Sequence, residues 1–128
     1  MPQRSKSEIG RLGEELTAYY LERSGYEILR RNWRIKGGEI DIIACRNGII
    51  AFVEVKTRDI SAVETGAEAV RQRKKSLILR AAQEYSYRYP HDMQPRFDIA
   101  EVTVKNGRAI KLSYFDNAFD GGNSDYIL

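Results

Sequence analysis

An Asn47-Gly48 pair between two apolar segments constrains the fold of this chain more than any other feature of its sequence. Asn-Gly flanked by alternating hydrophobic residues is among the strongest short signals for a two-residue β-hairpin turn. We therefore predict antiparallel strands over residues 39–46 and 49–56, with Arg46 opposite Ile49. One face would carry Ile40, Ile42, Ala51, Val53 and Val55, and the other Ile43, Cys45, Ile50 and Phe52. Strands that are apolar on both faces require a covering layer on each.

The other segments predict two helices and three further strands. Apolar residues at helical spacing predict helices over 7–24 and over about 67–89, the second after a capping box formed by Thr65 and Glu68. Strands are predicted over 26–34, 96–104 and 108–115. The order αβββαββ predicts one α/β sandwich domain over residues 1–128, its sheet flanked by helices, with a weakly structured tail over about 116–128.

Composition limits the class of protein. The chain has 42% hydrophobic and 30% charged residues, which is typical of a globular domain. No apolar run approaches the roughly 18 residues of a membrane span, and the first residues contain no signal-peptide core. The single cysteine, Cys45, fits a reducing compartment. We expect a cytoplasmic protein that has no membrane partner.

Acidic residues converge at one end of the predicted hairpin. Asp41 would lie opposite Glu54 and Glu39 opposite Lys56, with all four side chains on one face. Facing carboxylates destabilise a sheet unless a cation lies nearby, and oxygen ligands favour Mg²⁺ or Mn²⁺. Such an ion would lower the pKa of a bound water, and Lys56 would position that water or stabilise a pentavalent phosphate. The alternative is an ionic cluster without metal.

The first helix offers a third acid. Glu14 shares a stripe with Gly10, Ala18 and Leu21, which are small or apolar and let another surface approach closely. Glu15 falls on a charged face that meets solvent. Glu14 is therefore the better candidate to reach the acidic cluster, and the alternative is an ordinary exposed glutamate.

Positive charge is concentrated in two segments, residues 1–36 and 61–90, although the net charge is only +3. Such segments suit a phosphate backbone, and they also suit solvated helix faces. If the second helix begins beside the acids, a basic rim is formed by Arg58, Arg71, Arg73, Lys74 and Lys75. Three remaining polar residues are assigned structural rather than catalytic roles. We expect Cys45 to be a core thiol, His91 a solvated loop residue, and Asp98 the partner of a neighbouring Arg or Lys.

Three motifs in order resemble the YraN-like family of small bacterial proteins. They are Gly13-Glu14, the Gly-Glu-Ile-Asp-Ile-Ile of residues 38–43, and the Phe-Val-Glu-Val-Lys-Thr-Arg of residues 52–58. The similarity continues through Ala69-Val70, Lys74, Arg96-Phe97-Asp98 and Asn117-Ala118-Phe119. That family in turn resembles the PD-(D/E)XK nuclease superfamily, especially archaeal Holliday junction resolvases, although Ile40 stands where the superfamily has proline.

The resemblance implies a restriction-endonuclease-like sandwich with a mixed sheet, which hydrolyses DNA phosphodiesters with Mg²⁺ or Mn²⁺. Asp41, Glu54 and the backbone carbonyl of Val55 would bind the ion, Lys56 would assist the attacking water, and Glu14 would be the helix acid. The resolvases cut two strands as dimers, so the resemblance fits a homodimer that acts on branched or structured DNA. The alternative is a module that binds nucleic acid on the same fold without cutting it.

Overall fold

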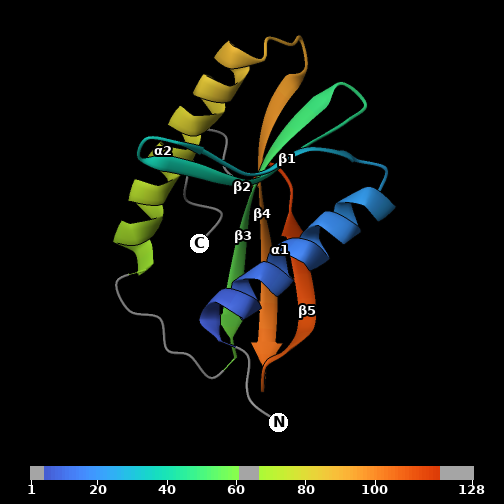
Figure 1. Ribbon diagram of the computed structural model, residues 1–128, viewed down its shortest axis with the longest axis vertical. Coiled ribbons are helices and arrows are strands. Elements are labelled where there is room, and N and C mark those ends of the chain that lie inside the picture. Colours follow the sequence, from blue (N-terminus) through green and yellow to red (C-terminus); the bar gives the residue numbers. More distant parts are fainter. Residues whose placement is uncertain (1–4, 61–66, 119–128) are drawn as a thin grey trace.

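A five-stranded sheet lies between two helices (Figure 1). The computed structural model describes residues 5–60 and 67–118, and the side chains of residues 67–75 lie outside that description. The elements are α1 (Lys6–Arg23), β1 (Glu27–Ile35), β2 (Gly38–Arg46), β3 (Ile49–Asp59), α2 (Ala67–Arg88), β4 (Gln94–Lys105) and β5 (Arg108–Phe115). This order confirms the predicted αβββαββ arrangement. None of the described helices has both the length and the apolar character needed to cross a lipid bilayer.

The strands lie side by side in chain order, from β1 to β5. Neighbouring strands are antiparallel except for β3 and β4, which are parallel, so the sheet is mixed. A parallel pair needs a long crossover connection, and α2 supplies it. The predicted capping box at Thr65 falls outside the described residues.

Local sequence explains where α1 and the central hairpin begin and end. Ser5 and Glu8 form a capping box at the start of α1. At its end Gly25 has φ +91°, and the N–H of Tyr26 donates to the carbonyl of Leu21 at 2.9 Å, which satisfies a terminal carbonyl of the helix. Asn47 also has a positive φ and is followed by Gly48 in the same region, as a type I′ hairpin turn requires.

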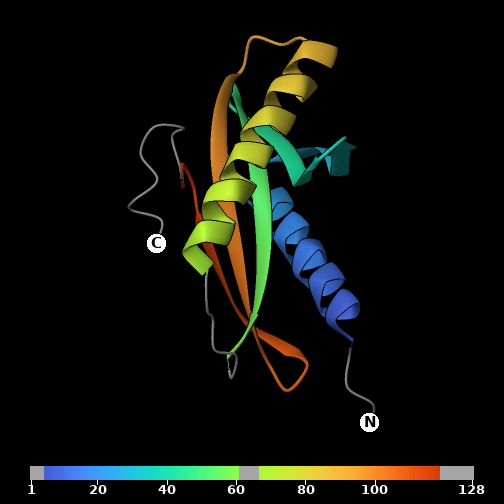
Figure 2. The same cartoon turned by 90° about the vertical axis from the view of Figure 1, so that its left-hand side faces the viewer.

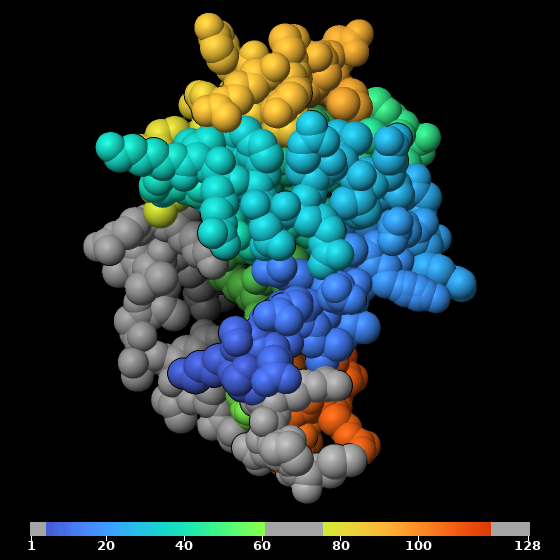
Figure 3. All heavy atoms as spheres, in the orientation of Figure 1, coloured from blue at the N-terminus to red at the C-terminus, as the bar shows by residue number. Residues whose placement is uncertain are grey.

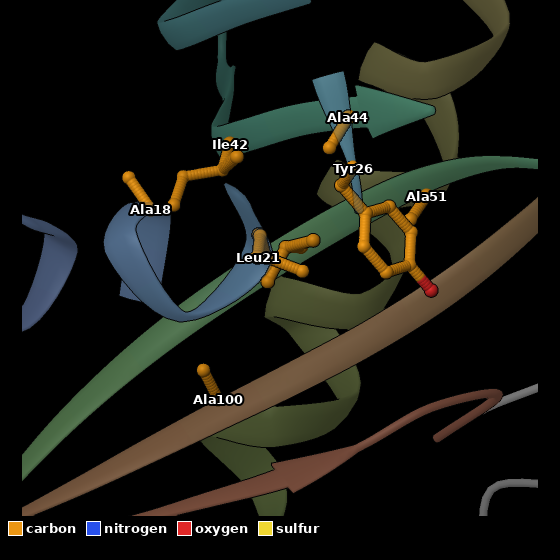
Figure 4. Packing of buried hydrophobic residues seen from close by; sticks show 8 residues of the cluster. Ala18, Leu21, Tyr26, Ile42, Ala44, Ala51 and Ala100 are labelled. Carbon is orange, nitrogen blue, oxygen red and sulfur yellow. The ribbon is translucent and has the colours of Figure 1, made fainter. Parts of the chain in front are cut away.

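Each helix covers its own face of the sheet (Figure 2). On the α1 face the buried cluster contains Ala18, Leu21, Tyr26, Ile42, Ala44, Ala51, Val53 and Ala100. Figure 4 shows Leu21 directed from α1 toward this layer, where the sheet presents mostly alanine methyl groups. Full burial of a leucine side chain contributes about 1.5–3 kcal/mol. On the α2 face the cluster contains Ile40, Ile43, Ile50, Phe52, Ala81, Ala82 and Tyr85.

Ile40 lies on the opposite face from the predicted one. It packs with Ile43 on the α2 face, whereas Ile42, two residues along β2, packs on the α1 face. The β1–β2 ladder explains this change, because it has pairs at Arg31↔Ile42 and Trp33↔Ile40 but none between them. Asn32 lies at that interruption with φ +51°. The outer part of the β1–β2 hairpin is therefore rotated relative to the rest of the sheet.

The start of the predicted tail is packed, not loose. The N–H of Ala118 donates to the carbonyl of Phe97 at 2.7 Å, and Ala118 is buried. The N–H of Asn117 donates to the carboxylate of Asp98 at 2.9 Å. The prediction of weak structure is wrong for residues 116–118, and residues 119–128 lie outside the described part of the chain.

Candidate functional site

The strands β2 and β3 separate one residue before the predicted Asp41–Glu54 pair. Their register follows the prediction through five pairs, from Arg46↔Ile49 to Ile42↔Val53. Beyond that point β3 continues to Asp59 and stays paired with β4 along its whole length. The edge of β3 that faces β2 is therefore open beyond Val53, and side chains can reach its backbone.

Asp41 lies at this divergence. Its Oδ2 accepts a hydrogen bond from the backbone N–H of Val55 at 2.7 Å. In an extended strand the N–H and C=O of one residue point to the same side, so the Val55 carbonyl is directed to the same open edge. The aspartate thus occupies the position that a backbone acceptor of β2 would have taken, beside the segment from Glu54 to Lys56.

Glu54 is the most deeply buried carboxylate among the candidates, at 5% exposed, whereas Asp41 is half-buried. Alternation along β3 directs Glu54 and Lys56 to the α2 face, because Phe52 packs there against Tyr85. A carboxylate removed from water costs several kcal/mol unless its charge is compensated. Compensation of the Glu54 charge therefore has a large energetic role.

Glu14 reaches the same part of the sheet from the α1 face. The helix approaches β3 closely at Gly13, where an added Cβ would lie 3.5 Å from Cγ1 of Val55 and inside the van der Waals limit of Cγ2 of Thr57. Glu14 follows directly and is half-buried, whereas Glu15 is exposed and lies 3.9 Å from Arg31. The predicted difference between the two glutamates agrees with this burial. Glu14 and Glu54 approach the divergence from opposite faces of β3.

Substituting Gly13 by Ala will test whether this close approach is needed. We expect a loss of about 1–3 kcal/mol in the free energy of unfolding, because an inserted methyl group overpacks a tight contact. Thr57→Ser removes the methyl group that meets the new Cβ, so the Gly13→Ala, Thr57→Ser double variant should recover part of the loss. Urea unfolding followed by circular dichroism measures both, and strict additivity of the two changes would contradict the contact. Gly10→Ala is the matched control, because its added Cβ would meet nothing within 4 Å.

Glu39 does not join the acids. It pairs with Arg34 in the β1–β2 ladder, and its Oε1 lies 3.5 Å from Nε of Arg34. The predicted Glu39–Lys56 opposition is therefore wrong, because β2 has left β3 before that point. Within residues 5–60 and 67–118, no three or more His, Cys, Asp or Glu side chains are close enough to hold a metal ion together. The three candidate acids thus form no compact triad.

The predicted basic rim is described only in part. Arg58 is exposed near the end of β3. The other four residues belong to the first half of α2 by their backbone, but their side chains lie outside the described part: Arg71, Arg73, Lys74 and Lys75.

A groove of about 560 Å³ runs between α1 and β1. Figure 3 shows the hollow between α1 in dark blue and the β1–β2 strands in cyan, with green β3 visible behind it. Its lining consists of Ser7, Gly10, Arg11, Glu14, Glu15, Arg31, Asn32 and Arg34. Sequence reasoning missed these three arginines as a group, although the basic character of residues 1–36 was a signal for them.

Asp98 forms a buried ion pair on β4, as its predicted structural role requires. Asp98 is 0% exposed, and its carboxylate accepts hydrogen bonds from Nε and Nη2 of Arg96 at 2.9 and 2.8 Å. The hydroxyl of Tyr114 also donates to it, and Arg96 extends the network to the hydroxyl of Tyr26. Hydrogen bonding to Asp98 raises the pKa of Arg96, and burial together with the nearby Asp98 raises the pKa of Tyr114. Sequence reasoning missed both tyrosines.

Cys45 and His91 have no features of catalytic groups. Burial raises the pKa of the half-buried Cys45 thiol, which keeps it protonated at neutral pH. The Nδ1 of His91 accepts the N–H of Met93 at 3.1 Å, so in the neutral ring Nε2 carries the proton and donates to Oγ of Ser86 at 3.1 Å. His91 is therefore bound into its loop, and the prediction of a merely solvated histidine is wrong.

Comparison with known proteins gives a consistent match. Residues 13–102 match the model of "Uncharacterised protein family UPF0102". A UPF0102 protein of Alkaliphilus metalliredigens is 45% identical over 118 residues, which covers 90% of this chain and 99% of the relative. Similar proteins from Flavobacterium johnsoniae and Dictyoglomus thermophilum are each 38% identical over 117 residues, covering 88% and 90% of this chain and 94% and 99% of the relatives. The matched range includes Glu14, Asp41, the segment 54–56 and Asp98.

Proposed function

We propose that this chain, which belongs to the uncharacterised protein family UPF0102, is a metal-dependent nuclease that hydrolyses DNA phosphodiesters, in branched or structured DNA. The observation that carries the proposal is the hydrogen bond from the Val55 N–H to Asp41, which holds a carboxylate against the Glu54–Lys56 segment. Such a hydrolysis requires carboxylates that hold a metal ion and a cation that stabilises the phosphate, and Asp41, Glu54 and Lys56 supply these groups on one short open edge.

The donor set at this edge fits Mg²⁺ or Mn²⁺. Mg²⁺ in proteins is held by one or two carboxylates and keeps several waters, which leaves positions for substrate phosphate. Asp41 and Glu54 supply two carboxylates, and the Val55 carbonyl supplies a third oxygen at the same edge. A three-acid cluster is not needed for such a site, so its absence among the described residues is compatible with this ion.

Each residue has a defined part in the proposed reaction. When bound, the ion supplies a charged contact for a phosphate oxygen and lowers the pKa of a bound water. Lys56, on the same face as Glu54, holds the attacking water or neutralises charge that develops on the phosphate. Glu14 accepts a hydrogen bond from water at the α1 side of the edge. Asp41 keeps its own orientation through the Val55 N–H.

Cleavage of junction, flap and linear DNA with Mg²⁺, with Mn²⁺ and with EDTA tests the activity. Metal binding is tested separately by calorimetric titration with Mn²⁺. Glu54→Gln should weaken Mn²⁺ binding at least about tenfold, because loss of even an outer contact to a metal site costs 10–100-fold in affinity. Glu39→Gln is the matched control, since that acid is held by Arg34 on the other strand pair. Equal Mn²⁺ binding in wild type and Glu54→Gln would reject the metal site.

The second candidate is a module that binds nucleic acid without cutting it. The observation that favours it is the set of three arginines, Arg11, Arg31 and Arg34, that line the groove between α1 and β1. Salt-sensitive DNA binding with no cleavage in either metal would support this function over the first.

A further inference from the structure

We propose that the groove between α1 and β1 seats the phosphodiester backbone of the nucleic acid, through Arg11, Arg31 and Arg34. This inference rests on the proposed function and names the surface that holds its substrate. The three arginines share one groove of about 560 Å³, although one lies on the helix and two on the strand. A planar guanidinium with several donors matches phosphate geometry and can bind it with two parallel hydrogen bonds.

The groove carries a positive balance. Three arginines line it against two glutamates, Glu14 and Glu15, which leaves one net positive charge. The substrate class follows from this balance and from the form of the surface. An open groove walled by a helix and a strand suits an extended polyanion.

Arg31 and Arg34 of β1 each form a weak surface ion pair with a glutamate. Arg31 lies 3.9 Å from Glu15, with side chains 39% and 63% exposed, and Arg34 lies 3.5 Å from Glu39, with 71% and 38% exposed. Ion pairs this exposed contribute about 0–1 kcal/mol. A phosphate that offers charge-assisted bonds can therefore displace the glutamates at little cost.

The groove leads to the divergence of β2 and β3. Asn32 lines it and lies at the ladder interruption, between the pairs Arg31↔Ile42 and Trp33↔Ile40. In this register the residue across from Asn32 is Asp41, the acid that receives the Val55 N–H. Glu14 lines the helix side of the same groove. A backbone seated on the arginines would thus run beside the proposed site of hydrolysis.

Equilibrium binding in EDTA tests this surface, because no cleavage can occur without metal. The probes are fluorescein-labelled junction, duplex and single-stranded DNA, followed by fluorescence anisotropy over a range of salt concentrations. Arg31→Ala and Arg34→Ala should each weaken binding to all sequences and lower the slope of log K against log salt by about 1. The double variant should lower that slope by about 2. An unchanged affinity and slope in the double variant would overturn the inference.

Glu15→Gln separates a binding role from a structural one. It removes the acid that competes for Arg31, so we expect tighter DNA binding, whereas a pair that serves only the fold predicts no gain. The matched controls come from α2, where Arg88 and Glu84 form an ion pair at 2.9 Å with side chains 53% and 39% exposed. Arg88→Ala should leave the salt slope unchanged, and Glu84→Gln should leave affinity unchanged. Equal losses in Arg88→Ala and Arg31→Ala would mean diffuse attraction and would reject the groove.

The outcomes separate this inference from the nuclease proposal. Groove-dependent DNA binding without any metal-dependent cleavage would reject the nuclease and keep the binding surface. Cleavage that persists when Arg31 and Arg34 are both replaced, with unchanged affinity, would reject the groove alone. Competition by polyglutamate as effective as that by unlabelled DNA would show a surface for acidic protein segments and would overturn the inference.

Discussion

Asparagine in place of Asp41 will reduce metal-dependent DNA cleavage by about 10²–10⁴-fold. The proposed ion contributes several kcal/mol of charge stabilisation in the transition state, and each 1.4 kcal/mol corresponds to about a factor of ten in rate. Asn keeps an oxygen that can accept the Val55 N–H, so the local backbone contact survives while the negative charge is lost. Initial rates on a labelled junction, measured in Mg²⁺ and Mn²⁺, give the effect.

The control for this substitution comes from the same strand. Glu39→Gln removes a carboxylate two residues away that is paired with Arg34 of β1. At saturating DNA, where a change in affinity through Arg34 does not alter the rate, it should leave cleavage within about twofold of the wild type, because no contact with the reacting groups is lost. Circular dichroism of both variants checks that the fold persists. Activity retained in Asp41→Asn would exclude this carboxylate from the reaction.

Substituting Asp98 by Asn will lower the free energy of unfolding by about 3–5 kcal/mol. Removing one partner of a buried ion pair leaves the other charge uncompensated, and here Arg96 would keep its guanidinium among buried groups. The amide of Asn also supplies donors where Asp98 accepts from Tyr114 and from the N–H of Asn117. Guanidinium unfolding followed by Trp33 fluorescence and by circular dichroism measures the loss.

Asp92→Asn is the matched comparison, because it makes the same chemical change at an exposed residue just before β4. Exposed substitutions of this kind change stability by no more than about 0.5 kcal/mol. A change below about 1 kcal/mol in Asp98→Asn would show that the network contributes little as an ion pair. Loss of stability in Asp98→Asn should also loosen the packing of Ala118 against β4, since Asn117 is held by the same carboxylate.

The sequence predicted the hairpin register because the turn determines it locally. Asn47 and Gly48 adopt the positive φ angles of a two-residue turn, and each following pair is then determined by counting. The register counted from the turn does not predict where packing outside the hairpin separates its two strands. The ladder between β2 and β3 ends at Ile42↔Val53, so Asp41 meets a backbone N–H instead of Glu54.

The greater burial of Glu14 than of Glu15 was predictable for a different reason. A helix that packs closely on a sheet needs small or apolar residues at the contact, and Ala18 and Leu21 of the predicted stripe are buried there, although the closest approach is at Gly13 and not at Gly10. The larger apolar residues of α1 predicted its buried face less well, because Leu16 and Tyr19 are 37% and 51% exposed. The arginine groove was not predictable from either pattern, since it depends on how α1 and β1 are packed together in three dimensions.

The parallel pairing of β3 with β4 also bears on the kinetics of folding. It joins two segments separated in sequence by the whole of α2, so the entropy of closing a long loop must be overcome before these contacts form. The candidate acids and lysine, from Glu14 to Lys56, precede that connection, in α1 and in the β1–β2–β3 meander, whose strand pairings are local. We expect the β1–β2–β3 meander to form first and the docking of β4 to be the late step, which completes the site because β4 is the strand that pairs with β3 beyond Val53.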